Sequence, residues 1–179
     1  MIQNAYIVSS IRTPVGKAGG VFNNVRPDDL LSFILKTLLA DNPSVDPNMI
    51  DDTIIGCAMP EAEQGLNIAR ISSLLANYPD SVSGITVNRF CASGLQSIAY
   101  AADRIRLGEA DIMVAGGVES MSMIPMMGHH PAFNIKTFNE DNIGIAYGMG
   151  TTAEQVVNKY SINRDSQDQF AFESHQKAI

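Results

Sequence analysis

Cys91 stands where a short apolar run gives way to a helical pattern, a position that suits covalent chemistry. Residues 84–88 (GITVN) predict a buried strand, and the periodicity that follows predicts a helix beginning around Cys91. Unpaired N–H groups and the positive dipole end of a helix N-terminus favour the thiolate, which is the nucleophilic form of cysteine. A backbone N–H beside Cys91 would also be placed to stabilise an oxyanion. The same pattern fits a small buried side chain in a helix–sheet contact, so both interpretations stay open here.

The other side chains that could do chemistry fit structural roles better. Cys57 lies in an apolar run and is predicted to belong to the core. His129 and His130 are adjacent, so their side chains diverge, and no second ligand pair has metal spacing; we predict no metal site. His175 is expected on the surface of the last helix. Glu119 follows a predicted buried strand, either as a buried, hydrogen-bonded structural carboxylate, which we favour, or as a catalytic acid.

The elements that would position Cys91 alternate between strand and helix. Short apolar runs predict strands over residues 4–9, 52–57, 84–88 and 111–115. Helical spacing predicts helices over residues 27–41, 66–75 and 91–107. The alternation predicts an α/β layered domain with a largely parallel sheet. Because the strands are continuous apolar runs, helices are expected to cover both faces of that sheet.

The inward faces of two helices follow from their apolar spacing. In the second helix the residues expected to face the core are Ile68, Ile71, Leu74 and Leu75. In the third they are Leu95, Ile98, Ala102 and Ile105.

Residues 119–150 have no clear period and are rich in Met, Gly, Pro and Asn. A connection this long without regular structure is more often functional than spare. After it, residues 151–160 are predicted to be helical, and Asn163 is a plausible N-cap for a final helix. The chain stops inside that helix, and we expect it to be a piece of something longer.

Composition narrows the class of protein. The 179 residues suffice for one domain with a hydrophobic core. A net charge of −7 argues against phosphate-backbone binding, so no nucleic-acid partner is expected. No apolar run is long enough to span a bilayer, and residues 1–10 do not form a secretory signal; the expected compartment is the cytoplasm. Two cysteines are too few for a secreted disulfide scaffold.

Four separated motifs together resemble the thiolase family, over the whole chain. Residues 87–96 (VNRFCASGLQ) resemble the thiolase nucleophile motif, and residues 115–122 (AGGVESMS) resemble a second family segment. Residues 12–17 (RTPVGK) and 149–154 (MGTTAE) resemble two more. Residues 60–70, with Asn88 to Cys91, are similar to the degradative 3-ketoacyl-CoA thiolases rather than to the acetoacetyl-CoA type.

The resemblance implies a fold and a reaction. Thiolases are about twice this length and consist of two similar α/β halves, so residues 1–179 would be the N-terminal domain, with a mixed, mostly parallel sheet; residues 119–150 would begin an irregular active-site loop region. Cys91 would take the acyl group from a 3-ketoacyl-CoA, release acetyl-CoA, and pass the acyl group to CoA, as in fatty acid β-oxidation. Coenzyme A is then a substrate, and no separate cofactor is implied.

The resemblance also implies site residues and partners. Asn88, Gly94 and Met149 would line the substrate pocket. The family's activating His, second Cys and Asn-plus-His oxyanion site lie in the C-terminal half and match nothing here, so the isolated chain is expected to be inactive. Gly148 stands where the family often has His. A homodimer or homotetramer of the full-length subunit is expected, with no membrane partner.

Two alternatives remain beside the 3-ketoacyl-CoA thiolase. One is an acetyl-CoA C-acetyltransferase, which acts on acetoacetyl-CoA. The other is a non-catalytic thiolase-like interaction module, in which Cys91 would be inert. Reaction with iodoacetamide would distinguish the non-catalytic module from the two enzymes. An activated thiolate reacts well below pH 8, whereas an inert core thiol does not.

Overall fold

The computed structural model describes residues 2–179, which divide after Pro131 into two units. The first unit contains the sheet and the turn that carries Cys91. The second unit, Ala132–Ile179, contains two longer helices.

Three parallel strands form the sheet of the first unit. They are β1 (Asp52–Gly56), β2 (Ser83–Val87) and β3 (Met113–Gly117), in the order β2-β1-β3. Gly56 pairs with Val87 on one side and with Gly117 on the other, so the carboxyl ends of the three strands lie level. This confirms the predicted parallel α/β sheet; β3 begins two residues later than predicted, and residues 2–179 contain no antiparallel strand.

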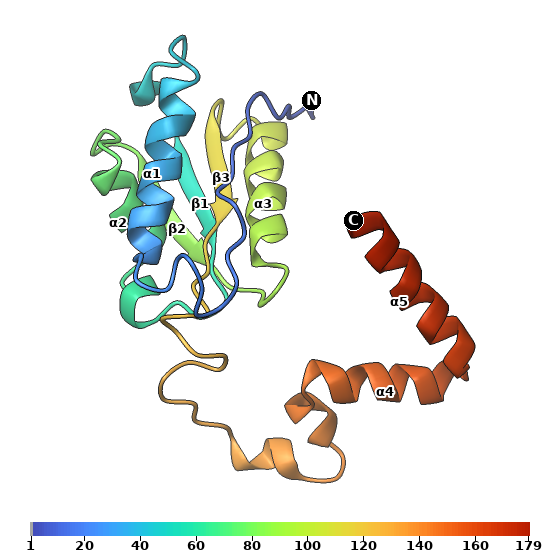
Figure 1. Ribbon diagram of the computed structural model, residues 1–179. Coiled ribbons are helices and arrows are strands. Elements are labelled where there is room, and N and C mark those ends of the chain that lie inside the picture. The colour runs from blue at the N-terminus through green and yellow to red at the C-terminus, as the bar shows by residue number, and fades with distance from the viewer. Residues whose placement is uncertain (1) are drawn as a thin grey trace. The chain divides into compact units, whose positions relative to one another are not determined.

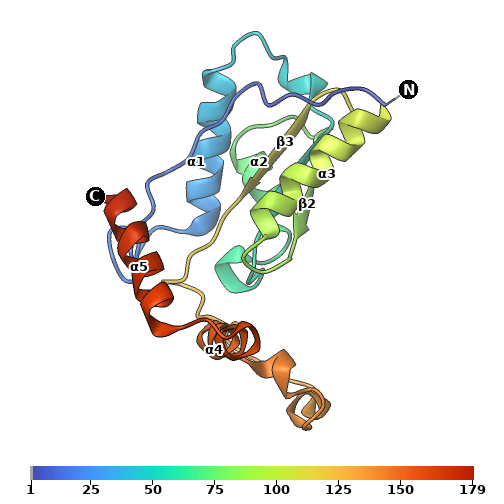
Figure 2. The same ribbon diagram turned by 90° about the vertical axis from the view of Figure 1, so that its right-hand side faces the viewer.

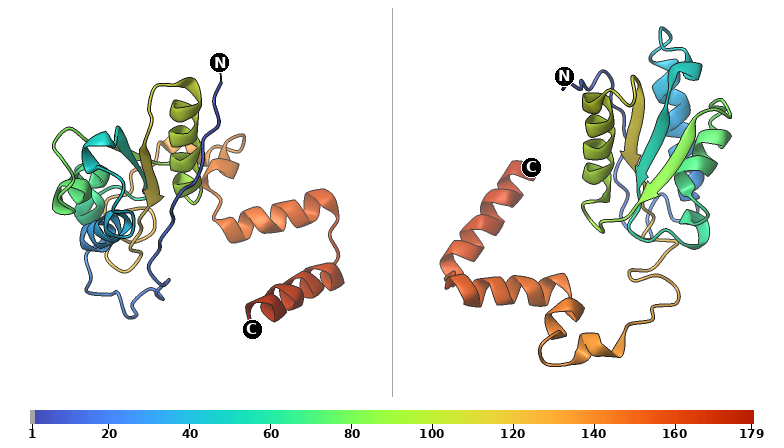
Figure 3. Two further views of the ribbon diagram at one scale, coloured as in Figure 1. Left: turned by 90° about the horizontal axis from the view of Figure 1, so that it is seen from above. Right: turned by 180° about the vertical axis from the view of Figure 1, so that it is seen from behind.

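Helices cover both faces of this sheet, as predicted. The helices α1 (Pro27–Ala40) and α2 (Ile68–Leu75) lie on one face, and α3 (Ser93–Leu107) lies on the other (Figures 1 and 3). Pro27 occupies the first turn of α1, where its missing N–H costs no hydrogen bond. Gly108 ends α3 in the left-handed conformation that glycine adopts without steric cost.

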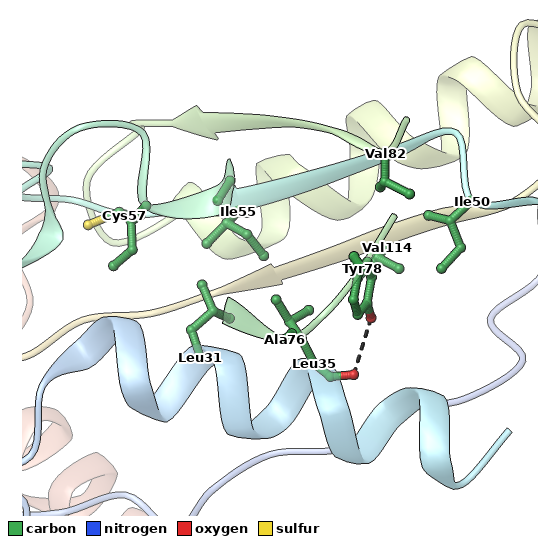
Figure 4. Close-up of a cluster of buried hydrophobic side chains, with 11 residues drawn as sticks. Leu31, Leu35, Ile50, Ile55, Cys57, Ala76, Tyr78, Val82 and Val114 are labelled. Carbon is green, nitrogen blue, oxygen red and sulfur yellow. Dashed lines mark hydrogen bonds between the residues drawn. The ribbon is translucent and has the colours of Figure 1, made fainter. Parts of the chain in front are cut away.

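The core lies between the sheet and the helices α1 and α2. Figure 4 shows the part of it between α1 and the strands. Leu35 and Ile55 are almost completely buried there, from α1 and β1 respectively. The hydroxyl of Tyr78 donates a 3.2 Å hydrogen bond to the backbone carbonyl of Leu35. Burial raises the pKa of Tyr78 to about 12, because the charged phenolate would be desolvated.

The predicted inward face of α3 is wrong in part. Leu95 is 72% exposed and Ile98 is 41% exposed, whereas Ser93, Ser97 and Ala101 are buried against the sheet. The sheet approaches α3 too closely for large side chains, and the Ser97 hydroxyl donates a 2.8 Å hydrogen bond to the carbonyl of Gly116. Leu95 and Ile98 are therefore turned away from the sheet, whereas Ala102 and Ile105 are half-buried (Figure 2 shows α3 in front of the sheet).

A similar correction applies to α2. Leu74 and Leu75 are exposed, and the buried residues are Ile68, Ala69, Ser72 and Ser73. A β-carbon added to Gly84 of β2 would come within 2.7 Å of the backbone nitrogen of Arg70. The approach of strand to helix selects small residues on this face as well.

The predicted strand at residues 4–9 is also wrong. This segment pairs with no strand, and Tyr6, Ile7 and Val8 are exposed. Its start is held beside the end of α3, where the backbone N–H of Gln3 donates to the carbonyl of Arg106 at 3.1 Å. An apolar extended segment becomes a strand only where a neighbouring edge can take its backbone hydrogen bonds.

The second unit consists of short and long helices. Two 3₁₀ turns, Ile135–Phe138 and Ile143–Ala146, precede α4 (Met149–Tyr160) and α5 (Arg164–Ala178). The Asn163 side chain accepts a 2.8 Å hydrogen bond from the Ser166 N–H, which confirms the predicted N-cap. Between residues 2 and 179, no helix has the length and apolar character needed to cross a bilayer.

Candidate active site

Cys91 is an exposed thiol in the turn between β2 and α3. The helix α3 begins at Ser93 with Ala92 as its N-cap residue, two positions later than predicted, so Cys91 lies just before the helix. No protein acceptor binds the backbone N–H of Cys91 or of Gly94 within residues 2–179. An exposed thiol, with nearby backbone N–H groups that no protein acceptor takes, is compatible with acyl transfer through a thioester.

The turn that presents Cys91 is strained and tied down. Phe90 has a φ of +47°, a left-handed conformation that costs a non-glycine residue about 1 kcal/mol. Its N–H donates a 2.8 Å hydrogen bond to Oδ1 of Asn88. The Ser93 hydroxyl accepts from the Arg89 N–H at 2.8 Å and donates to the Phe90 carbonyl at 2.6 Å. Strained residues held by such bonds are frequent at functional sites.

Asn88 and Gly94 flank Cys91 at this edge of the sheet. The Nδ2 group of Asn88 donates a 2.9 Å hydrogen bond to the carbonyl of Ala58, beyond the end of β1. A β-carbon added to Gly94 would have no other heavy atom within 4 Å, so the space over Gly94 is open. Both residues lie close to Cys91 in sequence and in the turn; their place in a substrate pocket stays a prediction.

Glu119 binds the loop that follows β1. Its carboxylate accepts hydrogen bonds from the Ala58 N–H at 2.6 Å and from Nε2 of Gln64 at 2.6 Å. The expected burial of Glu119 is wrong, because the residue is exposed; its hydrogen bonds nevertheless hold the carboxylate against the loop. The geometry matches the structural alternative for Glu119.

Cys57 differs sharply from Cys91. It is 1% exposed and lies in the core cluster beside Gln64, whose Nε2 group is 3.4 Å from its sulfur. Burial, aided by the negative charge of Glu119, raises the pKa of Cys57 to about 12. The predicted core role of Cys57 is confirmed, and a thiol so hard to ionise is a poor nucleophile.

The three histidines are exposed. The backbone N–H of His129 donates to the carboxylate of Glu61, and His130 follows it. His175 lies on α5, exposed as predicted. No group of three or more His, Cys, Asp or Glu side chains in residues 2–179 has the geometry to hold a metal ion. Met149 begins α4 in the second unit and is 71% exposed; its pocket role stays a prediction.

Gln64 is the residue of this region that the sequence reasoning missed. It is fully buried, and its amide contacts Met59, Glu119 and Ser120. A glutamine in a polar stretch such as residues 60–65 ordinarily predicts an exposed side chain. The amide of Gln64 is satisfied in the interior by Glu119 and Ser120, which are distant in sequence and come close only in the folded chain.

Comparison with known proteins adds independent evidence. Residues 5–179 match the family model described as "Thiolase, N-terminal domain". The chain is 53% identical to a 3-ketoacyl-CoA thiolase of Bacillus subtilis over 178 residues, covering 99% of this chain and 45% of that protein. It is 43% identical to a 3-oxoadipyl-CoA/3-oxo-5,6-dehydrosuberyl-CoA thiolase of Escherichia coli, covering 98% of this chain and 48% of that protein.

The fold has a match among solved structures as well. The acetyl-CoA acetyltransferase of Bacillus anthracis aligns with a TM-score of 0.78 at 33% identity, over 98% of this chain and 46% of that one. The chain therefore spans about half the length of the relatives it matches.

Proposed function

This chain belongs to the thiolase family, and from that premise we propose that Cys91 is the nucleophile of a 3-ketoacyl-CoA thiolase. The single observation that carries the proposal is the exposed Cys91 sulfur in a strained, hydrogen-bonded turn at the carboxyl end of a parallel sheet. Open α/β sheets bind their ligands at that edge. Relatives at 53% and 46% identity, both named 3-ketoacyl-CoA thiolases, support the substrate class.

The proposed reaction has two half-reactions. The thiolate of Cys91 attacks the 3-keto carbon of the substrate, and the bond between C2 and C3 breaks; the electron pair stays on C2, which takes a proton, and acetyl-CoA leaves. The thiolate of CoA then attacks the thioester carbonyl, and Cys91 departs as the thiolate. The N–H groups of Cys91 and Gly94 are the donors that this chain offers to the oxyanion.

The groups that move the protons in this scheme lie outside the chain. By the family resemblance, the activating histidine and the second cysteine belong to the C-terminal half, and His129, His130 and His175 do not take that place. We therefore expect the isolated chain to be inactive in thiolysis. Asn88, Gly94 and Met149 are proposed to line the acyl-CoA pocket of the complete subunit, which we expect to form a dimer or tetramer.

The outward face of α3 is the surface we expect the rest of the subunit to cover. It exposes Leu95 and Ile98, and the chain spans only about half of its relatives. Large exposed apolar side chains in one stripe are typical of an interface.

A chimera tests the function. It joins residues 1–179 to the part of the Bacillus subtilis 3-ketoacyl-CoA thiolase that this chain does not match. We expect the chimera to cleave a 3-ketoacyl-CoA in the presence of CoA, with activity lost in Cys91→Ser and retained in Cys57→Ser. Thiolysis that survives Cys91→Ser, or an inactive chimera beside an active Bacillus subtilis enzyme, would overturn the proposal.

The non-catalytic module is separated by reactivity of the chain alone. Modification of Cys91 by iodoacetamide below about pH 8 supports the nucleophile, and its absence supports the module. Substrate length distinguishes the 3-ketoacyl-CoA thiolase from the acetyl-CoA C-acetyltransferase. Only the former is expected to cleave substrates longer than acetoacetyl-CoA in the chimera assay.

A further inference from the structure

Glu119 is connected to the Cys91 turn by a continuous path of hydrogen bonds. The Val118 N–H donates a 3.0 Å hydrogen bond to the Gly56 carbonyl, which extends the β1–β3 ladder and brings Glu119 beside Ala58. The Glu119 carboxylate accepts from the Ala58 N–H at 2.6 Å and from the Met59 N–H at 3.4 Å. It therefore fixes the first residues beyond β1.

Gln64 binds the same loop from its buried side. Its Nε2 group donates to Glu119 at 2.6 Å and to the Met59 carbonyl at 2.9 Å, and its Oε1 accepts from the Ser120 N–H at 2.5 Å. Gln64 is fully buried and Ser120 is nearly so, which shields the Gln64–Ser120 hydrogen bond from water. Glu119 and Gln64 therefore connect the segment that follows β1 to the segment that follows β3.

Ala58 links Glu119 to the turn that carries Cys91. Its N–H is held by Glu119, and its carbonyl accepts the 2.9 Å hydrogen bond from Nδ2 of Asn88. The other end of the same amide, Oδ1 of Asn88, holds the N–H of the strained Phe90, next to Cys91. The path from Glu119 to the nucleophile runs through two residues, Ala58 and Asn88.

We propose that Glu119, supported by Gln64, is a positioning residue that fixes the Cys91 turn through Ala58 and Asn88. Its carboxylate is aimed at the N–H donors of the β1 loop, so it acts on the nucleophile through other residues and exchanges no proton with substrate. This inference rests on the proposed function for its catalytic consequence, but the positioning itself is measurable without turnover.

The first experiment measures the turn in the 179-residue chain. In Glu119→Gln, one carboxylate oxygen becomes an N–H₂ group that faces donors, so the Ala58 bond is lost or weakened. We expect hydrogen exchange of the Phe90 amide to become at least about tenfold faster. The Tyr78 amide, bonded to the Ser73 carbonyl in the core, should change by less than about twofold. The control is Glu109→Gln, which removes one charge at the far end of α3.

The second experiment measures catalysis in the chimera defined above. We expect Glu119→Gln to lower kcat about tenfold with KM within about threefold, because misplacement of a nucleophile affects the chemical step. Asn88→Ala should lower kcat comparably, and the double variant should lose no more than about the larger single loss, because both act along one path. Glu109→Gln should keep the kcat of the unsubstituted chimera.

The outcomes separate the two proposals. Unchanged exchange at Phe90 in Glu119→Gln overturns the positioning role, whatever the activity. Faster exchange with unchanged kcat, or losses that multiply in the double variant, overturns its catalytic consequence. If Glu119→Gln does not fold, Gln64→Glu, which places a second carboxylate against Glu119, must accelerate Phe90 exchange for the proposal to stand. An inactive unsubstituted chimera overturns the proposed function while the exchange result still decides the positioning.

Discussion

Gly56 lies so close to Ser93 that a β-carbon added to Gly56 would come within 2.3 Å of the Ser93 carbonyl carbon. The same atom would lie 2.4 Å from the backbone nitrogen of Gly94. The end of β1 therefore supports the first turn of α3, two residues beyond Cys91, through backbone contact alone. Only glycine at position 56 permits this spacing.

Gly56→Ala tests the contact. The new methyl group would meet backbone atoms that cannot rotate away, so we expect unfolding free energy to fall by at least about 2 kcal/mol. In the chimera, thiolysis should fall as well, since the turn bearing Cys91 must shift. Urea unfolding followed by circular dichroism measures the first effect.

Gly116→Ala is the matched control in the neighbouring strand. Its β-carbon would meet only the Cδ1 atom of Ile55, at an ordinary 3.6 Å. We expect a change within about 0.5 kcal/mol. Equal losses for the two alanine variants would show that the Gly56 contact is not what supports α3.

The sequence predicted β1 to β3 and α1 to α3 well, because each has its own local signal, whereas the strand predicted over residues 4–9 is absent. Pro27 with two acidic residues marks the start of α1, and Gly108 marks the end of α3. Continuous apolar runs identified β1, β2 and β3. The same local pattern predicted Cys91 at the start of α3; it lies in the turn just before that helix, where its sulfur is exposed.

The wrong inward faces of α2 and α3 share one cause: a periodic apolar stripe predicts that one face of a helix is buried, but it does not show against which part of the molecule. The stripe at Leu95 and Ile98 was assigned to the sheet, yet the sheet contacts Ser93 and Ser97 because Gly56 and the serine hydroxyl bonds bring backbones close. Gln64 could not be found in this way, since its partners are 55 and 56 residues away in sequence.

The two cysteines are expected to react very differently. Cys91 is exposed, whereas Cys57 is 1% exposed with a pKa of about 12. In the folded chain at about pH 7.5, iodoacetamide should modify Cys91 at least about a hundredfold faster than Cys57, because the thiolate is the reacting form. Peptide mass mapping measures both sites, and urea should abolish the difference. Similar rates in the folded chain would contradict the burial of Cys57.

Cys57 should also make the fold sensitive to alkaline pH. Its pKa is raised from an ordinary 9.0 to about 12, so above 9 the unfolded thiol ionises while the folded thiol stays neutral. Its contribution to stability is therefore complete below pH 9 and is lost as pH rises toward 12, at up to about 1.4 kcal/mol per pH unit. Urea unfolding between about pH 9 and about pH 10.5 measures this slope.

Cys57→Ala is the comparison that isolates this effect. Tyr78, whose pKa is also raised to about 12, adds a similar slope above pH 10 to both proteins, so the difference between them belongs to Cys57. Between about pH 9 and about pH 10.5, we expect the unfolding free energy of Cys57→Ala to fall less steeply than that of the unsubstituted chain. Parallel slopes would mean that Cys57 ionises equally in the folded and unfolded chains.

Leu95 tests whether the outward face of α3 is an interface. Because Leu95 is 72% exposed, Leu95→Gln in the 179-residue chain should change the unfolding free energy by less than about 0.5 kcal/mol. In the chimera, where the rest of the subunit is proposed to cover α3, the same change should cost about 1.5 kcal/mol or more, the value of burying a leucine. Leu35→Ala, in the core of the first unit, should cost about 2–5 kcal/mol in both proteins. The same small cost of Leu95→Gln in both proteins would refute the proposal that the rest of the subunit covers this face of α3. A docked partner must remove the exposed Leu95 side chain from water, so the chimera must respond to its loss.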